Sequence, residues 1–255
     1  MLAVERRAKI EQMIIKNKSV LVPELAKQFD VTTETIRSDL EKLEKQGVLV
    51  RTYGGATLVE SVEPDMEIHR RDTVNFEGKQ SIGRCAAGMI KEGETVFLDA
   101  STSSLHLARN IKDKRGITVI TNAEKIITEL AECPDIRVIC VGGMLNKKNM
   151  SYTGRIVEET IRKNYYANKV FFSCRGVTLQ RGLMESSEAE AEIKKAMIDC
   201  SESAIFLCDR KKLGRLGVPV ISGLERIDCF ITDIMLDEQW NEALAENDIR
   251  LINVE

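Results

Sequence analysis

Two patterns of hydrophobic and polar residues follow one another along the chain. In the first 46 residues, apolar side chains recur every three or four positions, as in Ile36, Leu40 and Leu43, which is the spacing of an amphipathic helix. Further along, short β-rich apolar runs alternate with amphipathic stretches, and the runs lie at residues 95–99, 117–121, 136–141, 169–174, 204–208 and 228–232. This alternation predicts βαβ units, and therefore an α/β fold with a mainly parallel sheet covered by helices.

The pattern divides the chain into two domains of unequal size. Residues 1–60 contain short helical segments followed by two β-type runs around Gly54-Gly55, which predict a hairpin. Residues 61–74 are charged and weakly periodic, so we expect them to form a linker. Residues 75–255 are expected to form the larger α/β domain. A chain of 255 residues fits this division, since one domain commonly contains ~100–200 residues.

The composition restricts the class of protein. Hydrophobic residues make up 43% of the chain, and there are only 4 prolines, which supports a packed core and argues against extensive disorder. No apolar run approaches the ~18–20 residues of a membrane span, and the first residues lack the apolar region of a signal peptide. The 7 cysteines are odd in number and include no C-x-x-C pair, which argues against a disulfide framework and a zinc site. We therefore expect a cytoplasmic protein with no cofactor, no metal and no membrane partner.

The charge balance depends on the part of the chain considered. A net charge of −3 argues against a protein that coats nucleic acid by bulk positive charge. Residues 1–60, however, carry 10 Lys and Arg against 9 Asp and Glu, whereas the remainder carries 27 against 31. A small, slightly basic domain with localised cations is compatible with sequence-specific DNA binding.

Residues 20–39 have the pattern of a helix-turn-helix. Leu25, Ala26 and Phe29 form the apolar side of a first short helix. We expect Thr32 to cap the second helix by accepting a hydrogen bond from one of its free backbone N–H groups. The motif therefore places a second helix after a tight turn, where it could read DNA.

The second helix has a polar face suited to DNA. If Ile36 points inward, Glu34 and Ser38 point nearly the opposite way, and Arg37 lies about a quarter turn aside. An arginine can read guanine through two hydrogen bonds, and hydroxyl groups can contact bases or phosphates. The alternative is a packing unit in which Arg37 lies in solvent beside Glu34 or Glu41. The candidate DNA-contacting residues of this helix are Thr32, Thr33, Glu34, Thr35, Arg37 and Ser38.

The predicted hairpin strengthens the DNA-binding interpretation. It carries Arg51 and Tyr53 beside its glycine tip, an arrangement suited to the DNA backbone or minor groove. Residues 35–40 read TIRSDL and residues 51–56 read RTYGGA. Together they resemble the winged helix-turn-helix of the DeoR family of bacterial transcription factors, in which a TIRRDL helix precedes an L-x-R-x-H-G-G-A wing. Ser38 stands where the family has a second arginine, and Tyr53 where it has histidine. The resemblance implies that residues 1–60 form a winged helix-turn-helix that binds operator DNA.

The loop after the strand at 95–99 carries groups suited to an anion. Asp99 is followed by Ser101, Thr102 and Ser103 at the expected start of a helix. Hydroxyl groups and free N–H groups at a helix N-terminus can bind a phosphate. The alternative is an ordinary group of N-capping residues.

Three further strand ends carry related features. Gly142-Gly143 would let a ligand approach the backbone closely, although paired glycines also form ordinary turns. Thr121-Asn122 has the same two interpretations. Lys212 or Lys211 could neutralise a phosphate and Asp209 could hold a sugar hydroxyl, and the alternative for Arg210 is a solvated turn. In open parallel sheets such strand ends are where ligands bind.

These segments occur in the order found in the sensor domain of the same family. VFLDASTSSLHLAR, VITNAEKI, VICVGGML, EAEIKKAMI and CDRKKLG each resemble a family segment, so the likeness spans about residues 3–255. It implies a fold related to ribose-5-phosphate isomerase and CoA transferases that binds a phosphorylated sugar or related metabolite. The implied effector-binding residues are Asp99, Ser101, Thr102, Ser103, Thr121, Asn122, Gly142, Gly143, Glu190, Asp209 and Lys212.

The competing hypothesis is a sugar-phosphate isomerase with an added DNA-binding domain. Isomerisation needs a base and groups that stabilise an oxyanion, and Asp99, Glu190 and Lys212 supply suitable types. A site that only binds an anionic sugar needs almost the same residues, so this list does not separate the two functions. The DNA-reading domain does, because an isomerase has no use for it. We therefore expect a non-enzymatic regulator, acting as a homo-oligomer (dimer or tetramer) that represses a carbohydrate-catabolism operon until a phosphorylated sugar binds.

Overall fold

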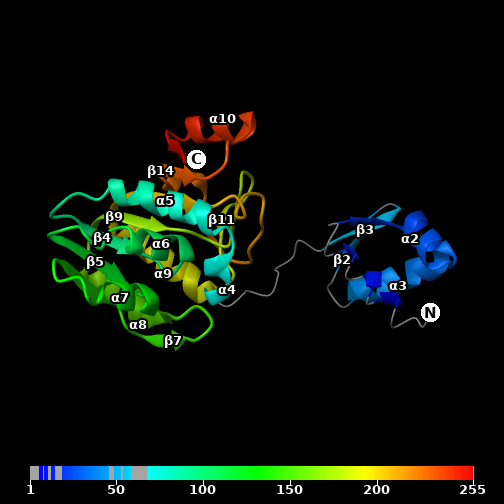
Figure 1. The fold of residues 1–255 in the computed structure, drawn as a ribbon, viewed down its shortest axis with the longest axis horizontal. Helices are drawn as coiled ribbons and strands as arrows, with labels where there is room; N and C mark the ends of the chain where they lie inside the picture. The colour runs from blue at the N-terminus through cyan, green and yellow to red at the C-terminus, as the bar shows by residue number, and fades with distance from the viewer. Residues whose placement is uncertain are drawn as a thin grey trace. The chain divides into compact units, whose positions relative to one another are not determined.

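The chain consists of two compact units. The computed structural model describes residues 6–7, 9–10, 13–14, 19–45, 49–52, 54–58 and 68–254. The units comprise Met1–Glu63 and Pro64–Glu255, blue and cyan-to-red respectively in Figure 1. None of the helices in the described parts of the chain has the length and apolar character needed to cross a membrane.

The N-terminal unit combines helices with a small antiparallel sheet. Its sheet has the order β1-β3-β2, and the hairpin of β2 and β3 lies where the sequence predicts it. Ser19–Leu21 forms strand β1 paired with β3, whereas the helical pattern of the first 46 residues did not predict a strand there. The elements are β1 (Ser19–Leu21), α2 (Val22–Phe29), α3 (Thr33–Lys45), β2 (Leu49–Thr52) and β3 (Gly55–Leu58).

This unit has its own hydrophobic core. Leu25 of α2 packs with Ile36 and Leu40 of α3, and each side chain is at most 1% exposed. Ile10 and Ile14, one helical turn apart, are fully buried in the same cluster. The inward direction predicted for Ile36 is therefore confirmed, and it places the other side of α3 in solvent.

The C-terminal unit is built on a seven-stranded parallel sheet with the order β15-β14-β12-β9-β4-β5-β6. All six runs predicted as strands lie in this sheet, which confirms the α/β fold. The seventh strand, β15, was not predicted from the sequence, because its short segment at the end of the chain is only half-buried. The strands are β4 (Thr95–Leu98), β5 (Ile117–Thr121), β6 (Ile136–Cys140), β9 (Ala167–Phe172), β12 (Ser201–Cys208), β14 (Cys229–Thr232) and β15 (Arg250–Asn253).

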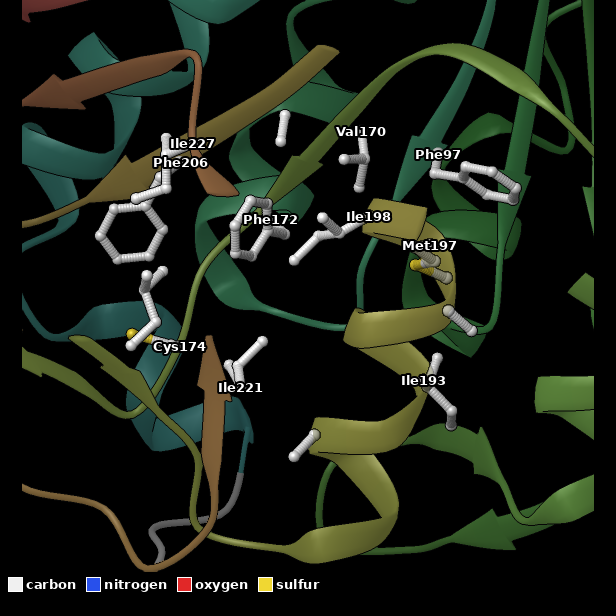
Figure 2. Close-up of a cluster of buried hydrophobic side chains, with 14 of the residues drawn as sticks. Phe97, Val170, Phe172, Cys174, Ile193, Met197, Ile198, Phe206, Ile221 and Ile227 are labelled. Atoms are coloured by element: carbon white, nitrogen blue, oxygen red, sulfur yellow. The ribbon is translucent and has the colours of Figure 1, made fainter. Parts of the chain in front are cut away.

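Hydrophobic side chains cover both faces of this sheet. Side chains alternate along each strand, so that Phe172 and Phe206 face one cluster whereas Phe171 and Ile205 face the other. The rings of Phe172 and Phe206 lie 5.5 Å apart between centroids, and Figure 2 shows Phe172 between Phe206 and Ile198 of helix α9. One cluster includes residues of α8 (Arg155–Asn164), α9 (Glu188–Asp199) and α10 (Glu238–Glu246), and the other includes residues of α5 (Phe76–Gly88), α6 (Thr102–Arg109) and α7 (Glu124–Leu130).

Two small antiparallel sheets are formed by segments that lie, along the sequence, between strands of the main sheet. The hairpin of β7 and β8 follows β6, and a three-stranded sheet has the order β10-β11-β13. Their strands have only three residues each, too few for a pattern of alternating polarity to reveal them in the sequence. The bounds are β7 (Met144–Asn146), β8 (Ser151–Thr153), β10 (Gly176–Thr178), β11 (Gly182–Met184) and β13 (Val220–Ser222), with a 3-10 helix at Leu224–Arg226.

The prediction of a linker over residues 61–74 is wrong for its second part. Residues Ile68–Thr73 form helix α4, which belongs to the C-terminal unit. Ile68 is buried, and Asp72 lies 2.9 Å from Arg109 of α6 and 3.1 Å from the buried His106. A segment this short has no room for an apolar stripe, so its sequence does not reveal a helix that tertiary contacts hold in place.

Candidate functional site

Thr32 and the first turn of α3 form the start of the candidate recognition helix. The hydroxyl Oγ1 of Thr32 accepts a hydrogen bond from the backbone N–H of Thr35 at 3.2 Å, so Thr32 caps the helix as predicted. Thr33, Glu34 and Ser38 are exposed. These groups are placed on the side of α3 opposite its buried face, where they are available to a partner.

Arg37 is exposed on the same helix but is not free of contacts. Its Nη1 lies 2.9 Å from Oε2 of Glu34, and the side chains are 59% and 78% exposed. An exposed ion pair of this kind contributes little to stability, because water screens the charges. Arg37 therefore has a local partner that DNA phosphates or bases would have to replace.

Arg51 of the β2–β3 hairpin, the candidate wing, is held in place by Glu44 near the C-terminus of α3. Arg51 donates from Nε to Glu44 at 2.7 Å, and its backbone N–H donates to the same carboxylate at 2.9 Å. These bonds hold the pKa of the Glu44 carboxyl below its usual value. Gly54 has a φ of +93°, a left-handed conformation that suits glycine at the hairpin tip. Tyr53, the other predicted wing residue, lies outside the described residues.

Asp39 is a buried carboxylate on α3 that the sequence did not single out, and its hydrogen bonds hold this helix in place. Asp39 on α3 is 3% exposed and accepts from Arg6 at 2.6 Å and from Arg7 at 3.3 Å. Its place in the TIRSDL segment was the only sequence clue. Asp39 therefore holds the other face of the helix that carries Arg37.

The sensor unit is organised around Asp99 at the end of β4. The carboxylate is 1% exposed, and its Oδ1 accepts from the hydroxyls of Ser101 and Ser104 at 2.6 and 2.5 Å. Its Oδ2 accepts from the backbone N–H of Ser173 at 3.2 Å and from Lys194 at 2.6 Å. Burial raises the pKa of Asp99, but the charge of Lys194 and the hydroxyl bonds outweigh it and hold the pKa below its usual value. Asp99 is consequently a structural acceptor.

Lys194 on α9 links this carboxylate to a second one. It is 5% exposed and also lies 3.2 Å from Oε2 of Glu185. Burial lowers the pKa of Lys194, whereas Asp99, Glu185 and the nearby Glu190 raise it, and the net shift is upward. The ammonium is therefore permanently charged and fully occupied by carboxylates.

Glu190, one turn before Lys194, is held by hydrogen-bond donors of the β7–β8 hairpin. Its Oε1 accepts from Ser151 Oγ at 2.5 Å, Asn149 Nδ2 at 3.1 Å and Asn146 Nδ2 at 3.4 Å. These donors lie about forty residues before Glu190 in the chain. The hairpin thus fixes the position of Glu190, because Oε1 of its carboxylate accepts all three of these hydrogen bonds.

A pocket lies where these elements meet. Four predicted residues line it, namely Ser101, Thr102, Glu190 and Lys212. Six further residues complete the lining, and they are Arg71, Ala100, Asn149, Cys174, Glu185 and Lys194. Among the described residues, Arg71 and Lys212 are the lining cations with no carboxylate within ion-pairing distance, whereas Lys194 has two. The pocket thus offers two available positive charges beside fixed carboxylates.

The other predicted effector residues lie beneath or beside this pocket. Asp209 is 1% exposed and accepts from the backbone N–H of Lys211, which shapes the loop that carries Lys212. Thr121 donates to the Leu98 carbonyl at 2.7 Å, so it joins two strand ends. Asn122 donates to the Tyr152 carbonyl, but its Oδ1 is buried without a partner in the described parts of the chain.

Ser103 and the paired glycines differ in their surroundings. The Ser103 hydroxyl is buried and has no hydrogen-bond partner among the described residues. A Cβ on Gly143 would lie 2.4 Å from Val157 and 2.8 Å from the Thr153 carbonyl, so this glycine permits close packing. A Cβ on Gly142 would meet no atom within 4 Å. Neither glycine lines the pocket.

Cys174 has both a core and a pocket position. It is 4% exposed and belongs to the hydrophobic cluster as a small core residue, and Figure 2 shows it near Ile221. Burial raises the pKa of its thiol to about 12, so the group stays protonated at neutral pH. It therefore contributes a small neutral wall to the pocket.

The two units match two family models. The DeoR-like helix-turn-helix domain model matches residues 6–62, and the DeoR C terminal sensor domain model matches residues 74–234. This chain belongs to the DeoR family of transcriptional regulators. Its relatives include the uncharacterized HTH-type transcriptional regulator YulB of Bacillus subtilis, 37% identical over 100% of this chain and 98% of the relative. A putative aga operon transcriptional repressor of Escherichia coli O157:H7 is 31% identical over 98% of this chain and 93% of that protein.

Solved structures with a similar arrangement are more distant from this DeoR-family regulator. Ribose 5-phosphate isomerase A of Methanocaldococcus jannaschii is 12% identical, with a TM-score of 0.41 over 55% of this chain and 56% of that chain. The regulatory function of the DeoR-family chain rests instead on the family models and on the full-length relatives.

Proposed function

We propose that this DeoR-family regulator is a cytoplasmic repressor of a carbohydrate-catabolism operon, released from its operator by a phosphorylated sugar. The observation that carries the proposal is the charge arrangement of the pocket. Within the described parts of the chain, Arg71 and Lys212 provide positive charge without carboxylate partners, while the Glu190 carboxylate is held beside them. Cations bind a phosphate through charge-assisted hydrogen bonds, and a carboxylate accepts from sugar hydroxyls. A ligand with a phosphate at one end and hydroxyls at the other satisfies both.

Effector binding also draws on the helix that follows β4. The α6 N-terminus carries Ser101, Thr102 and the unpaired hydroxyl of Ser103. Free N–H groups and the dipole at a helix N-terminus favour an anion. We assign Asp99 to positioning, because its bonds to Ser101 and Lys194 fix these elements. Thr121, Asn122 and Asp209 support the neighbouring strand ends.

DNA recognition is assigned to α3 and the wing. Arg37, with Thr33, Glu34 and Ser38 around it, would enter the major groove, and Arg51 would contact the backbone or minor groove beside Tyr53. Both arginines now pair with glutamates, so binding exchanges an exposed ion pair for a phosphate or base. The slightly basic domain alone gives modest, salt-sensitive affinity. We therefore propose that a homo-oligomer presents two such domains to repeated half-sites.

An isomerase activity is less well supported by the site. Asp99 would be a candidate base, yet its pKa is lowered and both oxygens already accept hydrogen bonds. Proton transfer at neutral pH favours a base whose pKa lies near the working pH. Turnover of ribose 5-phosphate by the pure full-length chain would favour the isomerase instead.

The proposal can be tested with the purified chain alone. A DNA site is first selected from a random duplex library by the full-length protein. Thermal shift and DNA-binding anisotropy are then measured with a panel of aldose and ketose phosphates and with the matching neutral sugars. We expect at least one phosphorylated sugar to raise the melting temperature and lower DNA affinity, while its neutral counterpart does neither. The absence of any response to the whole panel would overturn the proposal.

A further inference from the structure

Arg71 occupies the boundary between helix α4 and the effector pocket. Its Nη2 donates to Oδ1 of Asn149 at 2.8 Å. Its Nε is buried and has no hydrogen-bond partner among the described residues. Nε and Nη2 form one edge of the guanidinium, the two parallel donors that together bind a carboxylate or phosphate. Of these two donors, only Nη2 has a partner among the described residues, and that partner is the neutral amide of Asn149.

Asn149 connects Arg71 to the interior of the pocket. Through Nδ2 it donates to Glu190 at 3.1 Å, so one amide joins a cation of α4 to a carboxylate of α9. The backbone N–H of Ile68, the first residue of α4, donates to the carbonyl of Lys148 at 3.1 Å. Helix α4 is therefore attached to the turn between β7 and β8 at two adjacent residues.

A different set of bonds holds the other end of α4. Lys79 of α5 donates to the carbonyls of Arg71 and Val74 at 2.5 and 2.7 Å. Asn75, which follows the helix, donates to Asp233 at 2.9 Å. Of these contacts of α4, only the side-chain bond between Arg71 and Asn149 joins two residues that line the pocket. Helix α4 is also the first described element after the residues that lead from the DNA-binding unit.

We propose that Arg71 is an effector-binding residue that also transmits effector binding to helix α4. The anionic group of the effector takes both Nε and Nη2 and replaces Asn149, because a charge-assisted pair of bonds is stronger than one bond to a neutral amide. Losing the Arg71–Asn149 bond weakens the attachment of α4 to the turn at residues 147–150. This inference rests on the proposed function, since it requires that the pocket binds an anion.

The test compares two variants that break the same hydrogen bond. In the full-length protein, Arg71→Gln removes the anion ligand, whereas Asn149→Ala removes its competitor together with one of the three side-chain donors that hold Glu190. Inorganic phosphate and ribose 5-phosphate are titrated by calorimetry, and hydrogen–deuterium exchange is followed in the peptide covering residues 68–76. We expect Arg71→Gln to weaken binding of the bound probe about 10-fold or more. Asn149→Ala should keep or increase the affinity for inorganic phosphate, which has no sugar hydroxyl for Glu190 to bind, and its free form should exchange in 68–76 as fast as the loaded wild type.

The control is Arg70→Gln, which removes an exposed arginine from the same helix. It should bind and exchange like the wild type. Equal affinity in wild type and Arg71→Gln would overturn the role of Arg71, as would equal losses in Arg71→Gln and Asn149→Ala, which a merely structural bond predicts. If Arg71→Gln does not fold, Asn149→Ala alone tests the proposal, which fails if free Asn149→Ala exchanges in 68–76 as slowly as the free wild type. If the wild type binds neither probe and no other sugar phosphate, the proposed function itself fails.

Discussion

The ammonium of Lys194 lies 2.6 Å from the carboxylate of Asp99, and neither side chain is more than 6% exposed. The two residues are ninety-five positions apart, one on helix α9 and one at the end of strand β4. Their pairing joins the helix that carries Glu190 to the loop that carries Ser101, and both of these residues line the pocket. A buried pair needs both partners, because a charge left alone in the interior is strongly unfavourable.

Replacing Lys194 by methionine should therefore destabilise the sensor domain. We expect a loss of about 3–5 kcal/mol, the usual cost of leaving one buried charge unpaired. Lys195→Met provides a matched control on the same helix, since Lys195 pairs with Glu192 at partly exposed positions and should cost only about 0–1 kcal/mol. Urea unfolding followed by circular dichroism measures both. Similar losses in the two variants would contradict the importance of the Asp99–Lys194 pair.

The stability of the C-terminal unit should increase with pH above neutrality because of Lys79. Burial lowers the pKa of this lysine from 10.5 to about 8. Between these values the unfolded chain binds more protons than the folded one, so the free energy of unfolding rises with pH, by at most about 1.4 kcal/mol per unit. Urea midpoints from pH 7 to 10 give the dependence. The Lys79→Met variant should lack the lysine-dependent rise, and an identical pH profile for both proteins would refute this assignment.

Arg37 and Glu34 should have opposite effects on DNA binding. Arg37→Ala should weaken binding to the selected site by about 10–100-fold if the guanidinium contacts a base. Glu34→Gln should strengthen binding modestly, because it removes a negative charge near the phosphates and releases Arg37 from its ion pair. Lys42→Ala, elsewhere on the exposed surface of α3, is the control. Fluorescence anisotropy with a labelled duplex compares the three, and unchanged affinity in Arg37→Ala would remove it from the reading face.

Lys212 should affect the effector response and leave DNA binding intact. The lysine lines the pocket, while its neighbour Lys211 is exposed and does not. Lys212→Ala should raise the concentration of sugar phosphate needed for DNA release about 10-fold or more, because a charge-assisted bond is lost. Lys211→Ala should respond as the wild type does. Release at the same concentration in both variants would show that Lys212 does not bind the effector.

The sequence predicted the parts of this fold that carry long local patterns. The six apolar runs form parallel strands. Five of them lie in the interior of the sheet, where a strand is apolar on both faces, and β6 lies at its edge. Thr32 capped α3 and Ile36 pointed inward, because capping and helical periodicity act over only a few residues. Strands β13 and β15 escaped prediction because they pair with distant segments. The β7–β8 and β10–β11 hairpins escaped it because strands of three residues are too short to show a pattern.

Local sequence pattern pointed to pocket residues only where they follow strands, whereas Glu190 on α9 was implied by the family resemblance. Asp99 and Lys212 stand at strand ends, a position where ligands commonly bind. Lys194 lies within the family-like segment EAEIKKAMI, but nothing in its local sequence indicates that it pairs with Asp99. Arg71 lay in the segment expected to be a linker, because a six-residue helix leaves little pattern. Gly143 suggested a ligand contact, whereas packing against Val157 and Thr153 accounts for it.

The central claim is that the effector pocket and the DNA-reading surface are coupled. The most direct test is the affinity of the full-length protein for its selected duplex, measured by anisotropy with and without a saturating sugar phosphate that binds the pocket. We predict that the ligand weakens DNA binding about 5–150-fold, the range of a coupling free energy of ~1–3 kcal/mol, and that DNA weakens ligand binding by the same factor. A ligand that binds the pocket while DNA affinity stays the same would contradict the account.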